Sequence, residues 1–131
     1  MPGWGTGSFE NEHAQHWLEQ LSQLTPEGLS EMLQRAAEAD YLGAAEGSAA
    51  IAAAEVVAAA AGAPTDPLPG KISDWIGRFD GSPSARFIEV ASQAVEKVRR
   101  SSELRDLWHQ AEGLNEWSTS LRDLEVRLSP K

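Results

Sequence analysis

Cysteine is absent from this 131-residue chain, so the sequence offers no disulfide, no thiolate metal ligand and no thiol nucleophile. Basic residues are few, because 11 Lys and Arg face 20 Asp and Glu, which gives a formal charge of -9. This sign disfavours binding to nucleic acids, whose phosphates require a basic surface. We expect no cofactor, no metal and no nucleic-acid partner.

Long hydrophobic runs are also missing. The longest apolar stretch, around residues 49–61, is mostly alanine and contains Glu55, so it lacks the ~20 strongly apolar residues of a membrane-spanning helix. The first residues contain neither the basic segment nor the apolar segment of a secretory signal. These absences predict a cytoplasmic protein with no membrane association.

Acidic charge is concentrated in the first half of the chain. Ten acidic residues and a single base, Arg35, precede residue 71, whereas ten of each sign follow. Such an asymmetry is typical of a surface that attracts a partner of opposite charge, although acidic residues also keep proteins soluble with no partner involved. The candidates for an acidic docking surface are Glu27, Glu31, Glu38, Asp40 and Glu46.

The spacing of apolar residues predicts helices throughout the chain, and no segment shows the alternation of a β-strand. Asn11 is a candidate N-cap of the first helix, Thr25-Pro26 a cap and first residue of the second, and Ser82-Pro83 the start of a later one. At 131 residues the chain fits one domain. We therefore expect an all-α, compact single-domain bundle of about six or seven helices over residues 1–131.

Two segments should lie outside the helices. Residues 1–9 are rich in glycine and carry Trp4 and Phe9, which predicts an ordered N-terminal arm whose aromatic side chains pack on the bundle. Residues 62–70 hold three Pro and two Gly and form a linker between the acidic and the neutral half. The arm does not match a phosphate-binding loop, because neither glycine motif of such loops is present.

An alanine-rich helix is expected over residues 44–61, which include eleven alanines. A helix of small apolar residues lets its neighbours approach on every side, so it should lie at the centre of the bundle. Glu55 is the only charge in residues 48–64, and an unpaired buried carboxylate is costly. Three alternatives stay open: exposure on a polar edge with Ser48, burial against donors from Trp4, the glycine arm or the first-helix amides, or a catalytic or ligand-binding role.

Catalytic and metal-binding motifs are weak. His13 and His16 are three residues apart on the first helix, a spacing that lets two imidazoles share a metal, but helical geometry directs His16 to solvent and His13 to the margin of the apolar face. No G-x-S-x-G sequence is present, and no histidine has Ser and Asp at triad spacing. The tryptophans on apolar helix faces, which favour core packing over ligand binding, are Trp17, Trp75, Trp108 and Trp117.

Two stretches carry a family resemblance. They are Trp4-Gly5-Thr6-Gly7-Ser8-Phe9-Glu10-Asn11-Glu12 with Ala14 and Trp17, and Tyr41-Leu42 with Ala52-Ala53-Ala54-Glu55-Val56-Val57. Over nearly its whole length the chain resembles the small bacterial family catalogued as domain of unknown function 4259. The resemblance implies no activity. Members of that family tend to carry acidic residues where this chain has His13 and His16, which implies that these histidines do not form a shared site.

We interpret the protein as a non-catalytic interaction module whose acidic half docks a basic protein, and an immunity-type inhibitor of a basic nuclease toxin is one example. The alternative is a small enzyme or ligand-binding domain with a pocket between the N-terminal arm and the alanine-rich helix. The residues expected to form that pocket, or to support the structure around it, are Trp4, Phe9, Glu10, Asn11, Trp17, Tyr41 and Glu55.

Overall fold

The computed structural model describes residues 5–129, and within them the chain forms seven α-helices, two short 3-10 helices and no strand. The all-α prediction is therefore confirmed. In chain order the elements are α1 (Glu12–Gln20), η1 (Leu21–Gln23), α2 (Pro26–Glu38), α3 (Ala44–Ala60), α4 (Gly70–Trp75), η2 (Ile76–Arg78), α5 (Ala85–Arg100), α6 (Glu103–Gln110) and α7 (Leu114–Arg127). No helix in this range has the length and hydrophobicity needed to cross a lipid bilayer.

Short polar side chains cap the start of α1, α2, α5 and α6. The side chain of Asn11 accepts the amide proton of Ala14 at the start of α1, and Thr25 accepts that of Gly28 at the start of α2. The predicted start at Ser82-Pro83 was wrong by two residues. Ser84, not Ser82, is the N-cap of α5, because its hydroxyl accepts the amide proton of Phe87 at 3.1 Å.

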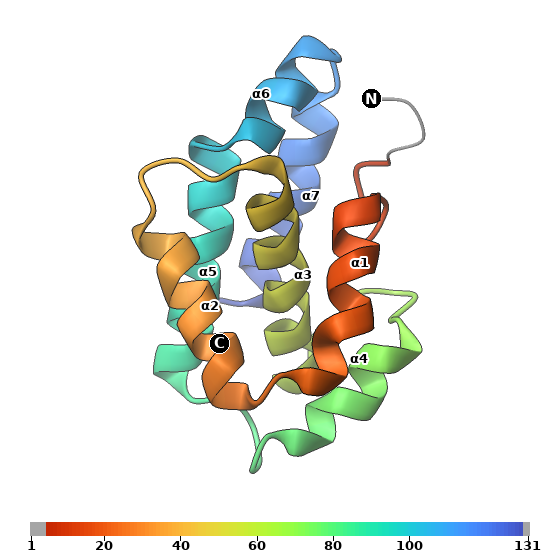
Figure 1. The fold of residues 1–131 in the computed structure, drawn as a ribbon, viewed down its shortest axis with the longest axis vertical. Coiled ribbons are helices and arrows are strands. Elements are labelled where there is room, and N and C mark those ends of the chain that lie inside the picture. Colours follow the sequence, from red (N-terminus) through yellow and green to blue (C-terminus); the bar gives the residue numbers. More distant parts are fainter. Residues whose placement is uncertain (1–4, 130–131) are drawn as a thin grey trace.

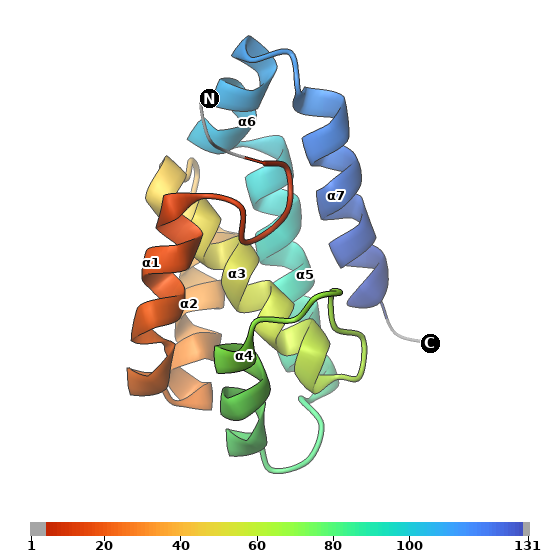
Figure 2. The same ribbon diagram turned by 90° about the vertical axis from the view of Figure 1, so that its right-hand side faces the viewer.

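The alanine-rich helix α3 lies at the centre of the bundle, as its composition predicts. Twelve of its 17 residues are buried, and it packs against α1, α2, α5, α6 and α7. Figure 1 shows α3 between α1 and α2, and the quarter turn in Figure 2 places α7 on the side of the molecule away from these two helices. Side chains no larger than a methyl group permit this close approach on several sides.

One hydrophobic core takes residues from all seven α-helices. The four helical tryptophans are buried in it, which confirms the preference for core packing, and the indole of Trp75 donates to the backbone oxygen of Leu24 at 3.0 Å. Phe9 of the arm packs partly buried against the core, whereas Trp4 lies outside the described residues. Gly62 follows α3 with a φ of 93°, a conformation that suits glycine after a helix.

Candidate functional site

Glu55 is buried inside the bundle and is neutralised there by an arginine from the last helix. The residue is 1% exposed. Its Oε1 accepts a hydrogen bond from Nη1 of Arg127 at 2.8 Å, and its Oε2 accepts one from Nη2 at 3.0 Å. The hydroxyl of Ser8 in the N-terminal arm donates to Oε2 at 2.6 Å. This burial excludes the alternative of an exposed polar edge, since Ser48 is buried as well.

Arg127 is held in place by a second set of contacts. Its Nη1 also donates to the backbone oxygen of Ala63 at 3.1 Å, and its Nε donates to Asp123 one turn earlier at 3.0 Å. The hydrogen bonds with Glu55 raise the pKa of Arg127 above its ordinary value, against the opposing effect of burial. The cluster therefore joins the arm, α3, the residues after α3 and the end of α7.

Three of the other predicted pocket residues, Glu10, Asn11 and Tyr41, make their side-chain hydrogen bonds away from Glu55. The carboxylate of Glu10 turns back to accept the amide proton of Gly7 at 2.9 Å, and Asn11 is occupied as the cap of α1. Tyr41 is 55% exposed and its hydroxyl donates to Asp106 of α6 at 2.7 Å. Because both carboxylate oxygens of Glu55 already accept hydrogen bonds, the geometry gives no support to a ligand pocket built on it.

Arg127 is the residue that the sequence reasoning missed. It lies 72 positions from Glu55, so no local pattern links the two. A weak signal exists in helical geometry, because at ~100° per residue Arg127 falls only ~60° from Leu124 on the apolar stripe of α7. A cation at the border of an apolar stripe is a reasonable partner for a buried acid elsewhere in the chain.

The acidic residues of the first half, Glu55 apart, lie at the surface. All five candidates for the acidic docking surface are exposed, namely Glu27, Glu31, Glu38, Asp40 and Glu46. The three glutamates of α2 lie within ~40° of one another around the helix, so they form one stripe. Because Arg127 compensates the buried Glu55, this half presents nine exposed acidic residues with Arg35 as its only base.

Hydrogen bonds to the α5–α6 junction position the segment between α2 and α3. The hydroxyl of Ser101 donates to the backbone oxygen of Asp40 at 3.0 Å, and the amide of Ala44 donates to the carboxylate of Glu103 at 2.7 Å. The Tyr41–Asp106 hydrogen bond adds a third connection and raises the pKa of the tyrosine above its ordinary value. Asp40 is thus fixed beside the start of α3.

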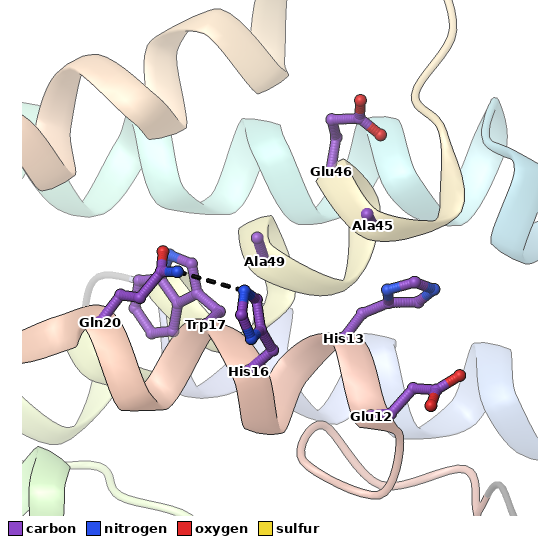
Figure 3. A pocket seen from close by; sticks show the side chains of 8 residues that line it. All are labelled: Glu12, His13, His16, Trp17, Gln20, Ala45, Glu46 and Ala49. Carbon is purple, nitrogen blue, oxygen red and sulfur yellow. Dashed lines mark hydrogen bonds between the residues drawn. The ribbon is translucent and has the colours of Figure 1, made fainter.

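An open groove of about 620 Å³ lies between α1 and the first turns of α3. Figure 3 shows His13 and His16 extending from α1 toward α3, where Ala45 and Ala49 form the other wall. Glu46 stands on α3 with its carboxylate directed away from α1 (Figure 3). We call this the α1–α3 groove. Trp17, Ala45 and Ala49 are its apolar lining residues, and Glu12 and Glu46 are its acidic ones.

A second cavity, of about 230 Å³, lies on the other side of Glu46, between α2 and α3. Met32, Leu42 and alanines of both helices line it, together with Arg35 and Glu46. We call this the α2–α3 groove. The two grooves share Glu46 and Ala49, so they lie on either side of Glu46 at the exposed start of α3.

The two histidines of the α1–α3 groove are not part of a metal-binding arrangement within the described residues. Nε2 of His16 lies 3.1 Å from the side-chain nitrogen of Gln20, as drawn in Figure 3. Among the residues that the structure describes, no group of three or more His, Asp or Glu side chains is arranged to hold a metal ion.

Comparison with known proteins identifies a family and nothing more specific. Neither a curated protein nor a solved structure matches the chain. The family model described as "Domain of unknown function (DUF4259)" matches residues 3–120, which include most of the arm, the alanine-rich helix and Glu55. Arg127 lies beyond the matched residues. The match covers most of the sequence, and the chain belongs to the DUF4259 family.

Proposed function

We propose that the protein is a non-catalytic interaction module that docks a basic protein on the face formed by α1, α2 and the start of α3. The observation that carries the proposal is the pair of grooves on either side of Glu46, which offer the apolar side chains of Trp17, Met32 and neighbouring alanines on the half of the chain that presents nine exposed acidic residues. The glutamate stripe lies on α2, the helix that also contributes Met32 and Arg35 to the α2–α3 groove. An amphipathic segment with lysine or arginine on its edges has the complementary pattern.

The apolar side chains of the grooves supply the contact area, and the charge supplies orientation and speed of association. Ala45 and Ala49 have side chains that let an approaching helix come close. The exposed carboxylates raise the local concentration of a basic partner, an effect that reaches 10–10³-fold in association rate at low salt. Since the Debye length falls from ~10 Å at 0.1 M to ~3 Å at 1 M, salt should weaken this attraction.

A capture experiment from the native cell tests the proposal. The tagged protein serves as bait at 50 mM and at 500 mM salt, beside a variant carrying Glu27→Gln, Glu31→Gln and Glu38→Gln. We expect the wild-type protein to retain a partner with a basic binding segment at low salt and to release it at high salt. The triple variant should retain much less of that partner at 50 mM.

A matched control removes the same charge from the neutral half. Asp80→Asn, Glu89→Gln and Glu116→Gln change three exposed residues outside the proposed surface, and this variant should capture the partner as the wild-type protein does. Equal capture by both triple variants, or a partner retained unchanged at 500 mM salt, contradicts docking on the acidic face.

A further inference from the structure

A cavity on the other half of the molecule has the opposite electrostatic character. It has a volume of about 480 Å³ and lies between the end of α5, α6 and the first turns of α7. Figure 2 shows these three segments together at the upper part of the bundle, away from α1 and α2. Its lining contains no carboxylate. Its charged members are Arg99, Arg100, Arg105 and Arg122, of which Arg99 and Arg100 also pair with Glu125 and Glu96 outside the lining. Asn115 and Ser118 add polar side chains. We call it the arginine cavity.

Helix dipoles account for only part of this arrangement. Arg99 and Arg100 stand in the last turn of α5, where a cation is favoured. The helix dipole does not explain the position of Arg105, because this residue lies in the first turn of α6, where the dipole opposes a positive charge. Arg122 lies in the middle of α7. Three helices therefore contribute cations to one cavity in a chain that is acidic as a whole.

Several donors of the cavity remain available to a ligand. Arg99 uses Nε and Nη2 on Glu125 at 3.1 and 3.3 Å, which leaves its Nη1 group free of that pair. Arg105 meets Asp106 only at 3.7 Å. Within residues 5–129, Arg122 has no ion pair, and the side chains of Asn115 and Ser118 have no hydrogen-bond partner.

The start of α7 adds backbone donors of the same polarity. Leu114 and Asn115 line the cavity and begin the helix, and the first amide of α7 bonded within it is that of Trp117, which donates to Gly113. The amides before it have no partner inside the helix and carry its positive end. Glu116 stands in the same turn but is not part of the cavity lining.

We propose that the arginine cavity binds a phosphorylated small molecule with two or more linked phosphate groups. Guanidinium groups match phosphate oxygens in bidentate geometry, and amide and hydroxyl donors complete such sites. The volume lies within the range of small-molecule pockets, ~300–1,000 Å³. A concave site of this size fits a short phosphate chain, whereas the charge of the whole chain, -9, opposes the extended contact that a nucleic acid needs.

Calorimetric titration tests this inference without reference to the proposed partner. Inorganic tripolyphosphate, pyrophosphate and phosphate are titrated into the full chain in 150 mM KCl, with citrate as a multivalent anion that lacks phosphate. We expect affinity to rise at least about fivefold with each added phosphate. A parallel titration with ATP distinguishes two kinds of ligand. If ATP and tripolyphosphate bind with equal affinity, the site recognises the phosphate chain alone. If ATP binds more tightly, the site recognises a nucleoside polyphosphate, and either result supports the site.

Single substitutions locate the site. Arg122→Gln and Arg105→Gln should each weaken tripolyphosphate binding about tenfold or more, because each removes a charge-assisted contact. Arg86→Gln removes the same charge from an exposed arginine of α5 outside the cavity and should change affinity less than about twofold. The three variants should show equal circular dichroism and melting temperature within a few degrees.

Three results overturn the proposal. They are no measurable binding of tripolyphosphate at millimolar concentration, equal losses in Arg86→Gln and Arg122→Gln, or citrate binding as tightly as tripolyphosphate. None of them bears on the capture of a basic partner by the acidic face, so failure of this inference and failure of the proposed function are distinguishable.

Discussion

Replacing Arg127 with methionine should destabilise the fold strongly, because it leaves the carboxylate of Glu55 buried without its cation. The side chain of Glu55 is 2% exposed and that of Arg127 is 17% exposed. Removing one partner of a buried ion pair costs ~3–5 kcal/mol. Since Arg127 is partly accessible, water will reach the site, and we expect the free energy of unfolding to fall by about 3 kcal/mol. This loss is a large share of the ~5–15 kcal/mol that stabilises a typical domain.

Urea unfolding followed by tryptophan fluorescence measures this loss. With a slope of ~2 kcal/mol/M for a domain of this size, the midpoint should fall by about 1.5 M. Arg122→Met, on the same helix but exposed, is the matched control and should change stability by less than ~0.5 kcal/mol. Methionine keeps the unbranched stem of arginine in both variants, so the comparison isolates the lost charge and its hydrogen bonds.

A double-mutant cycle with Glu55→Gln identifies the source of the loss. If the pair is the cause, Arg127→Met should cost much less in the Glu55→Gln background, with a coupling energy of ~2 kcal/mol. The reasoning is refuted if Arg127→Met shifts the midpoint no more than Arg122→Met does. It is also refuted if the costs of the two substitutions simply add.

Three further predictions concern single residues. The hydrogen bond to Asp106 raises the pKa of Tyr41, which is the only tyrosine in the chain. The absorbance of its phenolate should therefore appear at a higher pH than the ordinary pKa of ~10. In the Asp106→Ala variant this transition should return toward pH ~10. The corresponding stabilisation is present below pH ~10 and is lost as the pH rises through the raised pKa. Gly62→Ala should lower the free energy of unfolding by ~1 kcal/mol because φ is 93°, whereas Gly70→Ala, in helical backbone with open space around it, should raise it by ~0.5 kcal/mol in the same urea assay. Asn11→Ala should cost ~1 kcal/mol in that assay, and Asn11→Asp should retain most of the cap.

The fold was largely predictable because its determinants are local. The caps at Asn11 and Thr25 and the central position of the alanine-rich helix follow from short patterns, and the structure confirms them. The predicted start of α5 was wrong because Ser82 and Ser84 can both act as an N-cap. Only the packing of the following helix decides which hydroxyl meets the amide of Phe87.

The surroundings of Glu55 were not predictable, since they depend on contacts between distant segments. The sequence showed an isolated acid in an apolar helix and suggested the indole of Trp4, the arm amides or the first-helix amides as donors, whereas the donor that the structure shows in the arm is the hydroxyl of Ser8. It did not show that the end of α7 would deliver Arg127. Tyr41 was expected near this acid, but the path of the chain before α3 takes it to Asp106 instead.

The arginine cavity escaped the sequence reasoning for the same reason. Its cations are spread from Arg99 to Arg122, among an equal number of acids. A linear count of charge finds that half neutral. Helix packing then separates the positive side chains from the negative ones, so that the arginines line one cavity while their carboxylate neighbours lie outside its lining.

The association rate of the purified protein with its captured partner, measured by surface plasmon resonance across a series of salt concentrations, tests the central claim most directly. If the acidic face of α1, α2 and α3 docks a basic segment, the association rate should fall at least about tenfold between 50 and 500 mM salt, with little change in dissociation rate. The Glu27→Gln, Glu31→Gln, Glu38→Gln variant should show a much shallower dependence. An association rate that is independent of salt, or equally dependent in the wild-type protein and this variant, contradicts the account.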